Sequence, residues 1–416
     1  MSTVLKNFPI PSEWDWCQAQ DCMDVRDGTH DSPKYIAEGY PLVTSKNLID
    51  GEIDFSTCSY ISKEDHDAIS KRSGVDDGDI LYAMIGTIGN PVIVDKQFEF
   101  SIKNVALFQF NDGNVFNKYI YYFLESELTK RQFENRSRGG TQKFVSLTNI
   151  RELMIPLPPL AEQQKIAAIL DAADQLRQKD QQLIDHYTQL SQSLFLQMFG
   201  DPVMNPMGWG VTELGGVIGP IESGWSPVCE KEKRNSDNEW AVLKLSAVGN
   251  GVYNQYENKQ LSKEHAPKLN IEVKDGDLLI SRKNTDKLVG TCAYVFSTKR
   301  RLMIPDTIFR LQCNMEKCTS IFLWFLLKHK GFSQRVRLLA TGSAGSMPNI
   351  SKAKLNNFEI PLPPIESQNQ FAQHIEKIEQ QKQQAQASLE KSQALFNSLL
   401  QRAFKGELTR SDSRAA

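Results

Sequence analysis

Two long segments of the chain carry a continuous stripe of apolar residues at helical spacing. Between Ala161 and Phe199 there is no proline or glycine, and apolar residues recur in alternating steps of three and four. Such steps are typical of a coiled coil, in which one helix buries its stripe against another. Asp180 is the single polar residue on the first stripe. The stripe residues are Ile166, Ile169, Ala173, Leu176, Leu183, Tyr187, Leu190 and Leu194 in the first segment, and Phe371, Ile375, Ile378, Ala385, Leu389, Phe396 and Leu399 in the second.

Neither helix can bury its stripe alone, so we predict that the two helices pack against each other. The first helix connects one globular segment to the next, and the second helix leaves that next segment, so an antiparallel pair is expected. A helix of nearly 40 residues spans roughly 60 Å. The predicted arrangement is a dumbbell, in which a rod of two helices holds two domains apart around an approximate twofold axis.

A proline-rich connector precedes each helix and identifies an internal repeat. Residues 155–160 read Ile-Pro-Leu-Pro-Pro-Leu, and residues 360–365 read Ile-Pro-Leu-Pro-Pro-Ile. Each proline fixes its φ angle, lacks an N–H group and pushes the preceding residue to extended geometry. The connector is therefore stiff and marks the start of a helix. The chain is predicted to consist of two copies of one unit, each with a globular domain, a connector and a long helix.

The two globular segments share the same order of turns and strands. Residues 75–82 and 273–280 both place an Asp-Gly turn ahead of an apolar strand, a pattern typical of β-structure. A helix is predicted over Lys118–Phe133, and a glycine-rich loop preceded by arginines follows in both copies. We therefore predict an α/β (α+β) fold with two similar domains, two long antiparallel coiled-coil helices and a pseudo-twofold repeat. The predicted boundaries are 1–154 for the first domain, 155–200 for its connector and helix, 201–359 for the second domain, and 360–416 for the second connector and helix.

Composition limits the class of protein. The 416 residues are 40% hydrophobic and 24% charged, with a formal net charge of −2, which is ordinary for a globular protein of two or three domains. No apolar run approaches the roughly 20 residues of a transmembrane helix, and no signal peptide is evident. Seven cysteines form no Cys-x-x-Cys pair, so we expect reduced thiols, no zinc site and a cytoplasmic location.

The connector and helix segments resemble the DNA specificity subunits of Type I restriction–modification systems. The resemblance rests on residues 155–167 (IPLPPLAEQQKIA), their second copy, residues 193–202 with Phe-Gly-Asp-Pro at the helix end, and residues 398–408 (SLLQRAFKGEL). It extends over the whole chain, although the motifs within the domains are individually weak. It implies that the two globular parts are target-recognition domains for double-stranded DNA and that the helices are spacers between them.

The same resemblance implies that partners supply the chemistry. In that family the helices dock two copies of an adenine-N6 methyltransferase subunit, and a motor–nuclease (restriction and translocase) subunit joins the complex. S-adenosylmethionine, ATP and Mg²⁺ are then expected on the partner subunits and no cofactor or metal in this chain. Residues 366–369 (ESQN) depart from the first copy's 162–164 (EQQ), which puts local docking in doubt. The helix residues expected to contact partners are Gln163, Gln164, Ile166, Leu170, Phe199, Phe371, Phe396 and Phe404.

Basic and small polar residues in two matching pairs of loops are the candidates for DNA contact. Small residues allow the backbone to approach closely, while arginine and lysine contact phosphates or guanine. For any single residue, a solvated charged loop is an equally good explanation, but the recurrence in both copies favours the loops as sets. The candidates are Thr87, Arg136, Arg138, Thr141, Gln142 and Lys143 in the first copy, and Arg282, Lys283, Asn284, Thr285, Arg335, Arg337, Ser343 and Ser346 in the second.

The sequence provides no catalytic motif. A methyltransferase needs an Asn/Asp-Pro-Pro-aromatic motif and a glycine-rich cofactor loop, and an ATPase needs a P-loop; the chain has none of these. The acidic turns at residues 76–79 and 275–277 are explained by turn formation better than by metal binding. Two alternatives to a DNA-binding subunit stay open. One is a coiled-coil scaffold that binds only proteins, which predicts no salt-sensitive DNA affinity. The other is an enzyme with unrecognised chemistry, which predicts activity in the isolated chain.

Overall fold

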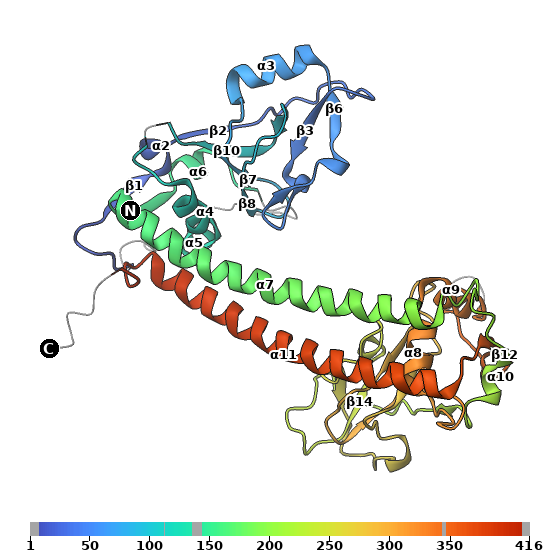
Figure 1. Cartoon of the computed structure of the whole chain (residues 1–416). Coiled ribbons are helices and arrows are strands. Elements are labelled where there is room, and N and C mark those ends of the chain that lie inside the picture. The colour runs from blue at the N-terminus through green and yellow to red at the C-terminus, as the bar shows by residue number, and fades with distance from the viewer. Residues whose placement is uncertain (1–7, 112, 135–143, 343–346, 410–416) are drawn as a thin grey trace. The chain divides into compact units, whose positions relative to one another are not determined.

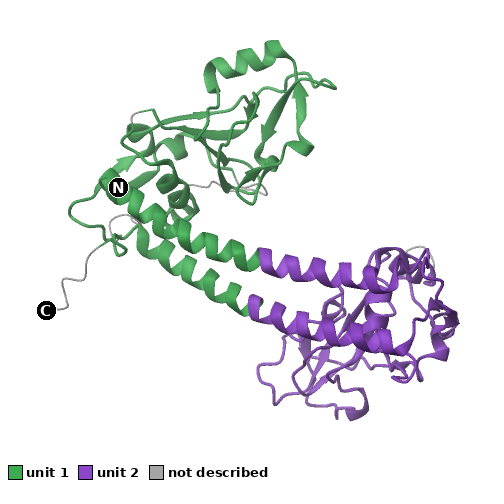
Figure 2. Ribbon diagram, in the orientation of Figure 1, with its two compact units in different colours: residues 1–181, 386–416 green, residues 182–385 purple. Residues whose placement is uncertain are grey.

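The computed structural model describes residues 8–111, 113–134, 144–342 and 347–409. The chain forms two compact units, and each unit contains one globular domain together with part of both long helices. Unit 1 consists of residues 1–181 and 386–416, and unit 2 of residues 182–385 (Figure 2). The final part of the second long helix therefore belongs to the unit of the first domain.

Unit 1 contains a four-stranded antiparallel sheet with a smaller three-stranded sheet beside it (Figure 1). The four-stranded sheet has the order β2 (Asp24–Asp27), β10 (Val105–Gln109), β7 (Ile80–Ala83) and β8 (Gly89–Ile93). The three-stranded sheet has the order β6 (Ser59–Ile61), β3 (Tyr40–Thr44) and β9 (Ser101–Lys103), with β3 and β9 parallel. Two strand pairs complete the β-structure: β1 (Asp15–Gln18) with β11 (Met154–Leu157), and β4 (Leu48–Ile49) with β5 (Glu52–Ile53). The short helices are α2 (Ala19–Cys22), α3 (Lys63–Ser73), α4 (Asn117–Glu125), α5 (Glu127–Glu134) and α6 (Leu147–Arg151).

Unit 2 repeats the order of the two larger sheets and of the β1–β11 pair, whereas the β4–β5 pair has no counterpart among its described residues. Its four-stranded sheet has the order β13 (Glu222–Ser223), β19 (Ile308–Leu311), β16 (Leu278–Ser281) and β17 (Cys292–Tyr294). Its three-stranded sheet has the order β15 (Asn258–Gln260), β14 (Ala241–Leu243) and β18 (Leu302–Met303), again with one parallel pair. The remaining elements are β12 (Val211–Glu213) paired with β20 (Glu359–Pro361), and helices α8 (Ser320–Lys328), α9 (Lys330–Leu338) and α10 (Lys352–Asn356). The predicted mixed fold and internal repeat are confirmed.

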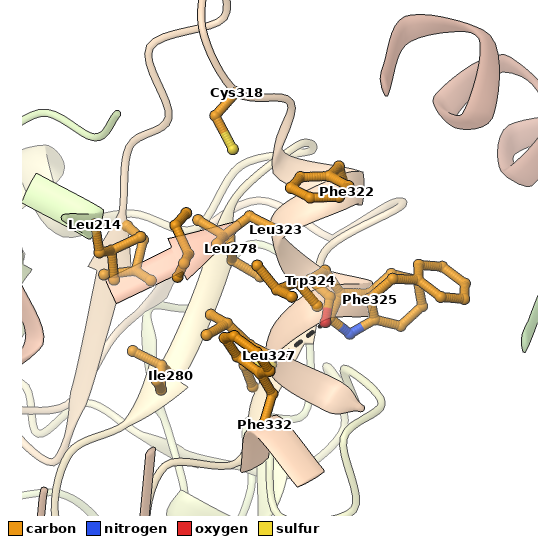
Figure 3. Packing of buried hydrophobic residues seen from close by; sticks show 14 of the residues in the cluster. Leu214, Leu278, Ile280, Cys318, Phe322, Leu323, Trp324, Phe325, Leu327 and Phe332 are labelled. Atoms are coloured by element: carbon orange, nitrogen blue, oxygen red, sulfur yellow. Dashed lines mark hydrogen bonds between the residues drawn. The ribbon is translucent and has the colours of Figure 1, made fainter. Parts of the chain in front are cut away.

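The four-stranded sheet of each unit separates two hydrophobic cores. Successive side chains of a strand point to opposite faces, so Ile80 and Tyr82 of β7 pack on the helix side, whereas Leu81 and Ala83 pack toward the three-stranded sheet. β16 of unit 2 divides its side chains in the same way. Figure 3 shows the helix-side core of unit 2, in which Leu323 and Leu327 of α8 lie toward Leu278 and Ile280 of the sheet, whereas the ring of Phe325 lies on the other side of α8. Because both faces are covered, these strands read as apolar runs without polar alternation.

The two long helices, α7 (Leu160–Phe199) and α11 (Ile365–Ala403), pack against each other in opposite directions. In unit 1 the early part of α7 meets the late part of α11, where Asp180 accepts a 2.8 Å hydrogen bond from the hydroxyl of Ser392. In unit 2 the late part of α7 meets the early part of α11, where the rings of Phe195 and Phe371 lie 5.7 Å apart. The antiparallel pair is confirmed.

The predicted stripe of α11 is correct, but three of the eight residues in the predicted stripe of α7 are exposed. Leu176, Leu183 and Leu190 are 41–45% exposed. The buried seam instead continues from Ala173 through Asp180, Ile184 and Phe195. Both sets fit steps of three and four, and the aromatic residues of the domains and α11 determine which set is covered. The exposed leucines along this part of α7 are Leu176, Leu183, Leu190 and Leu196.

The predicted single helix over Lys118–Phe133 is wrong in one detail. Ser126 has an extended ψ of 153° and separates α4 from α5, with its hydroxyl donating to the carbonyl of Phe123 at 2.6 Å. Serine competes for backbone hydrogen bonds in this way and favours helix ends. In unit 2, His329 makes the corresponding break between α8 and α9.

Candidate nucleic-acid interface

A cleft of about 680 Å³ opens on the domain of unit 1 beside the predicted loop that contains Thr87. One wall is formed by the end of β3 and the 3-10 helix η1 (Ser45–Asn47), and the other by the loop after β7. In that loop Gly86 has a φ of +80°, a conformation that glycine adopts without strain. The lining residues are Tyr35, Leu42, Thr44, Ser45, Lys46, Asn47, Thr57, Ser59, Ile85, Gly86, Thr87 and Asn104.

Hydrogen bonds within the cleft separate residues that shape it from residues free to bind. The amide of Asn47 is buried and fully used: its oxygen accepts from the Thr44 N–H at 2.9 Å, and its nitrogen donates to the Asp54 carbonyl at 3.0 Å. Lys46 and Thr87 are both exposed, and neither side chain has a hydrogen bond or ion pair among the described residues. The amide of Asn47 therefore fixes the turn that contains Lys46, and Thr87 lies on the opposite wall of the cleft.

In unit 2 the corresponding loop follows β16 and lies beside the segment that contains Asn349. Arg282 donates from Nε to the Asn349 side chain at 3.1 Å, and its guanidinium lies 5.1 Å from the centre of the Phe309 ring. The ammonium of Lys352 lies 5.7 Å from the same ring. Lys283 pairs with Asn349 through an isolated backbone bridge, and its side chain is exposed. Positive side chains from two separate segments, Arg282 and Lys352, thus lie beside one aromatic ring.

The arginines of α9 differ in how far they are committed to the chain itself. Arg337 donates to the carbonyls of Ser333 and Lys287 at 3.3 and 3.4 Å. The guanidinium of Arg335 lies 4.9 Å from the centre of the Phe332 ring and keeps its edge exposed to solvent. An arginine stacked on a ring in this way still presents its N–H groups to an anion.

Comparison with known proteins identifies the family. A sequence model described as the Type I restriction modification DNA specificity domain matches the chain twice, over residues 11–186 and 206–391. The two matches coincide with the two copies of the repeat. The chain belongs to this family of specificity subunits. DNA-sequence recognition within a restriction–modification system is therefore its general role.

Individual relatives agree with this assignment. The chain is 26% identical over 392 residues to the putative type I restriction enzyme MjaX specificity subunit of Methanocaldococcus jannaschii, with 89% of this chain and 88% of the relative covered. It is 32% identical over 175 residues to the EcoEI specificity subunit of Escherichia coli, but that alignment covers only 42% of this chain and 30% of the relative. The similarity to the second protein is thus confined to one part of the molecule.

Solved structures show the same fold. The crystal structure of a Type I restriction–modification S subunit from M. genitalium superposes with a TM-score of 0.59, with 14% identity and coverage of 94% of this chain and 96% of the other. A chain from a study of complex assembly in the type I restriction–modification system gives a TM-score of 0.52 at 19% identity, with coverage of 96% of this chain and all of the other. At these identities the similarity establishes the fold alone.

The residues predicted from the sequence to contact DNA fall into three groups. Thr87, Lys283, Thr285 and Arg335 are exposed at the surfaces just described. Arg282 and Arg337 are half-buried and held by the contacts above, whereas Asn284 is 5% exposed and accepts a hydrogen bond from the Thr285 N–H at 2.8 Å. Its prediction as a DNA-contacting residue is therefore revised to one that shapes the loop. The candidates that lie outside the described residues are Arg136, Arg138, Thr141, Gln142, Lys143, Ser343 and Ser346.

Sequence reasoning missed Lys46, Tyr35 and Lys352. Lys46 follows the strand β3 within a Thr-Ser-Lys-Asn sequence, and the Thr44–Asn47 capping box is the local signal that this strand ends in a fixed turn. Nothing local indicates that the turn lies across from Thr87, because the two positions meet only through the pairing of the sheets.

The acidic turns of the specificity subunit act as turns. Asp79 accepts a hydrogen bond from the Asp76 N–H at 2.8 Å, and Asp277 accepts from the Lys274 N–H at 2.9 Å. No group of three or more potential ligands that could hold a metal ion occurs among the described residues. Burial raises the pKa of Asp79 to about 6, because the ionised carboxylate is removed from water. Burial also raises the pKa of Asp277, although Arg310 beside it acts in the opposite direction.

The helix residues predicted to contact partners need correction, because all but one of them are buried inside the chain. Gln163 is 1% exposed and accepts from the Phe116 N–H at 2.8 Å. Gln164 alone is exposed and stays a candidate. The others are apolar members of the two helix-side cores, where they cannot also touch another protein: Ile166, Leu170, Phe396 and Phe404 in unit 1, and Phe199 and Phe371 in unit 2.

The sequence departure in the second connector has no structural effect on it. Gln368 takes the place of Gln163: its amide oxygen accepts from the Thr319 N–H at 2.9 Å, and its nitrogen donates to the Pro363 carbonyl at 2.8 Å.

The described part of the chain includes no helix long and apolar enough to span a membrane.

Proposed function

We propose that this specificity subunit recognises an asymmetric bipartite DNA site, with each unit reading one half. The observation that carries the proposal is the repeat itself: two domains of one topology present different side chains at matching places. Thr87 and Lys46 face the cleft of unit 1, whereas Arg282 and Lys283 occupy the loop after the matching strand of unit 2. Similar backbones with different surfaces select different base sequences at a related geometry.

The proposal includes docking of methyltransferase subunits along the helices, with restriction subunits joining the complex. An exposed face of α7 supports this part, because Leu183 and Leu190 are 41% and 42% exposed and lie seven residues apart on the same side of the helix. Apolar side chains at this spacing suit a partner helix. We further propose that this chain is non-catalytic and that S-adenosylmethionine, ATP and Mg²⁺ act on the partners.

The first test is to map methylated adenines in a host that carries this chain and a cognate methyltransferase subunit, with a matched host lacking the chain. A bipartite motif that appears only with the chain is expected. Exchange of residues 1–154 for the corresponding domain of a relative is expected to change one half of that motif. A change in both halves, or in neither, contradicts one reader per unit.

Single substitutions test the two surfaces separately. Lys46→Ala and Lys283→Ala are each expected to weaken binding to the mapped site and to reduce the salt dependence by about one phosphate contact, or to cost about 1–3 kcal/mol if the lysine reads a base. Lys377→Ala, an exposed lysine on α11, is the charge-matched control. Equal loss in the control and the two test variants implies a general charge effect and not specific contacts at these two surfaces.

The docking surface has its own test. Leu183→Glu and Leu190→Glu are expected to abolish co-purification with the methyltransferase subunit, because a charge is placed in an apolar contact. Gln182→Glu adds the same charge beside the stripe and should leave the complex intact. If all three variants co-purify normally, this face of α7 is not the docking surface. A scaffold that binds only proteins is supported instead if the intact complex has no salt-sensitive affinity for DNA.

A further inference from the structure

A second cavity, in unit 2, is separate from the loops proposed to read DNA. It has a volume of about 350 Å³ and is enclosed by α7, the junction of α8 and α9, and α11. Its apolar wall includes Phe195, Leu196, Trp324, Phe325 and Ile375. The volume falls within the range of small-molecule sites, which are mostly apolar with a few placed polar groups.

The side chains that line this cavity have an excess of positive charge. Lys328, Lys330 and Lys382 line it together with a single carboxylate, Glu379. None of the three ammonium groups has an ion pair or hydrogen bond among the described residues. The ammonium of Lys328 lies 4.9 Å from the centre of the Trp324 ring. Burial lowers the pKa of Lys328, and the positive charge of Lys382 lowers it further.

Two polar atoms in the lining residues also lack partners. The Trp324 indole Nε1 and the His329 Nδ1 are buried and form no hydrogen bond within the described part of the chain. An indole N–H can only donate. A buried donor without an acceptor is costly, so an incoming acceptor group would be favoured here.

The matching corner of unit 1 shows that this imbalance is not a property of the fold. There Arg177 takes the place of Lys382 and pairs with Asp174 at 2.6 Å. Tyr121 takes the place of Trp324, and the neighbouring Tyr122 donates its hydroxyl to Asp171 at 2.7 Å. Glu125, the last residue of α4, takes the place of Lys328, so a carboxyl group replaces an ammonium group at this position. The corner in unit 1 therefore has no excess of positive charge, whereas the corner in unit 2 keeps two uncompensated positive charges after Glu379 is counted.

We propose that this cavity binds a small aromatic anion of the nucleoside monophosphate type. Its acidic group would be held by Lys328 and Lys382, and its flat body would pack against Trp324, Phe325 and Leu196. Lysines attract the anion as flexible point charges, and an aromatic face provides a stacking surface that tolerates different ring systems. Such a ligand would join α8 to both long helices, so its binding stabilises unit 2.

The experiment is isothermal titration of the purified full-length chain with adenosine 5′-monophosphate, compared with adenosine and with inorganic phosphate. We expect saturable binding at one site per chain and at least tenfold weaker binding of adenosine and of phosphate, because each lacks half of the recognised features. Saturating ligand is also expected to raise the unfolding temperature. Absence of saturable binding to folded protein overturns the proposal, and phosphate binding as tightly as the nucleotide overturns the aromatic part of it.

Variants locate the site. Lys382→Met and Lys328→Met should each weaken nucleotide binding about tenfold or more, whereas Lys377→Met, an exposed lysine on the same helix and outside the cavity, should leave it unchanged. Circular dichroism and unfolding temperature establish that each variant is folded. Leu196→Gln, which alters the wall without altering charge, should weaken the nucleotide but not phosphate. Equal loss in Lys377→Met, or loss of DNA affinity alone in Lys382→Met, assigns these lysines to general electrostatics or to DNA and overturns the site.

Discussion

The two units share one backbone plan but neutralise their interior charges differently. In unit 2 the guanidinium of Arg310 is buried on β19, where it contacts Asp277 at 3.1 Å and Glu222. In unit 1 the matching position on β10 is Leu107, and Asp79 accepts hydrogen bonds from the Asp76 N–H at 2.8 Å and from the amide of Gln109 at 3.3 Å. The two units share the polar side chains that form hydrogen bonds with buried backbone groups. They differ in their buried and surface charges.

The glutamines that follow the proline connectors belong to the common set. The amide of Gln163 bonds to the Phe116 N–H and to the carbonyls of Pro158 and Asn114, and Gln368 makes the equivalent bonds in unit 2. Each amide joins its connector to the loop ahead of α4 or α8. A duplicated fold therefore keeps the polar groups that satisfy buried backbone atoms, because those atoms are the same in both copies.

Replacement of Arg310 is expected to have the largest effect. Arg310→Leu leaves Asp277 and two backbone carbonyls without their donor, so we expect unit 2 to lose about 3–5 kcal/mol. Urea unfolding of the full chain, followed by hydrogen exchange of β16 and β19, measures the loss and its location. Arg300→Leu, at an exposed site, is the control. The double variant Arg310→Leu with Asp277→Asn should recover part of the loss, because it removes the unpaired buried charge.

Replacement of the glutamines that follow the two connectors is expected to have the next largest effect. Gln163→Ala or Gln368→Ala leaves three buried backbone groups without partners, which we expect to cost about 3 kcal/mol in the affected unit. Gln164→Ala, one residue further and exposed, should change the stability by less than about 0.5 kcal/mol. Urea unfolding compares the three variants. Equal losses of stability in the first two variants indicate that the two glutamines stabilise their units to the same extent. A large loss in only one of them contradicts this equivalence.

The raised pKa of Asp79 predicts that the stability of unit 1 depends on pH. Its pKa rises from 3.8 to about 6 on folding, so the folded state binds more protons than the unfolded state between these values, and stability falls as pH rises through this window. Asp79→Asn keeps an oxygen acceptor for the Asp76 N–H and should remove about 1–3 kcal/mol of this pH dependence. Unfolding midpoints from pH 4 to 7 measure it. A wild-type chain whose unit 1 gains stability over that range contradicts the assignment to Asp79.

The smallest expected effect concerns the polar residue of the seam. The hydroxyl of Ser392 donates to Asp180 at 2.8 Å and also lies 3.1 Å from the Leu389 carbonyl. After Asp180→Leu the hydroxyl still has an acceptor, so we expect a change within about 1 kcal/mol. Asp180→Leu with Ser392→Ala should be at least as stable as wild type, because the pair is replaced by apolar contacts. Thermal unfolding compares both with wild type, and a large loss in the double variant identifies a role for this pair beyond stability.

The architecture was predictable because its signals are local and repeated. The two IPLPP connectors and the runs without proline or glycine identify the long helices, and the Asp-Gly turns align the two copies. The exposed face of α7 was not predictable, because Leu176 and Ile184 both fit a helical stripe. Only packing against α11 and the domains selects between them.

The candidate interface was predictable only in part for a similar reason. Thr87 and Lys283 were found because they occur in glycine-containing or basic loops that recur in both copies. Lys46 was missed because its position opposite Thr87 depends on a parallel strand pair formed by residues about sixty positions apart. Gln163 was assigned to a partner because an amide on a helix reads as exposed, whereas buried backbone groups around it require its hydrogen bonds.

The order of synthesis of the chain differs from the order in which its units can be completed. Phe396 and Phe404 of α11 lie in the core of unit 1, with Phe404 5.4 Å from the Tyr119 ring. Residues 386–409 are made after all of unit 2, so on a ribosome the first domain waits roughly 10–40 s at 5–20 residues per second with part of its core uncovered. During that interval the domain that is translated first is the one more exposed to proteases and chaperones.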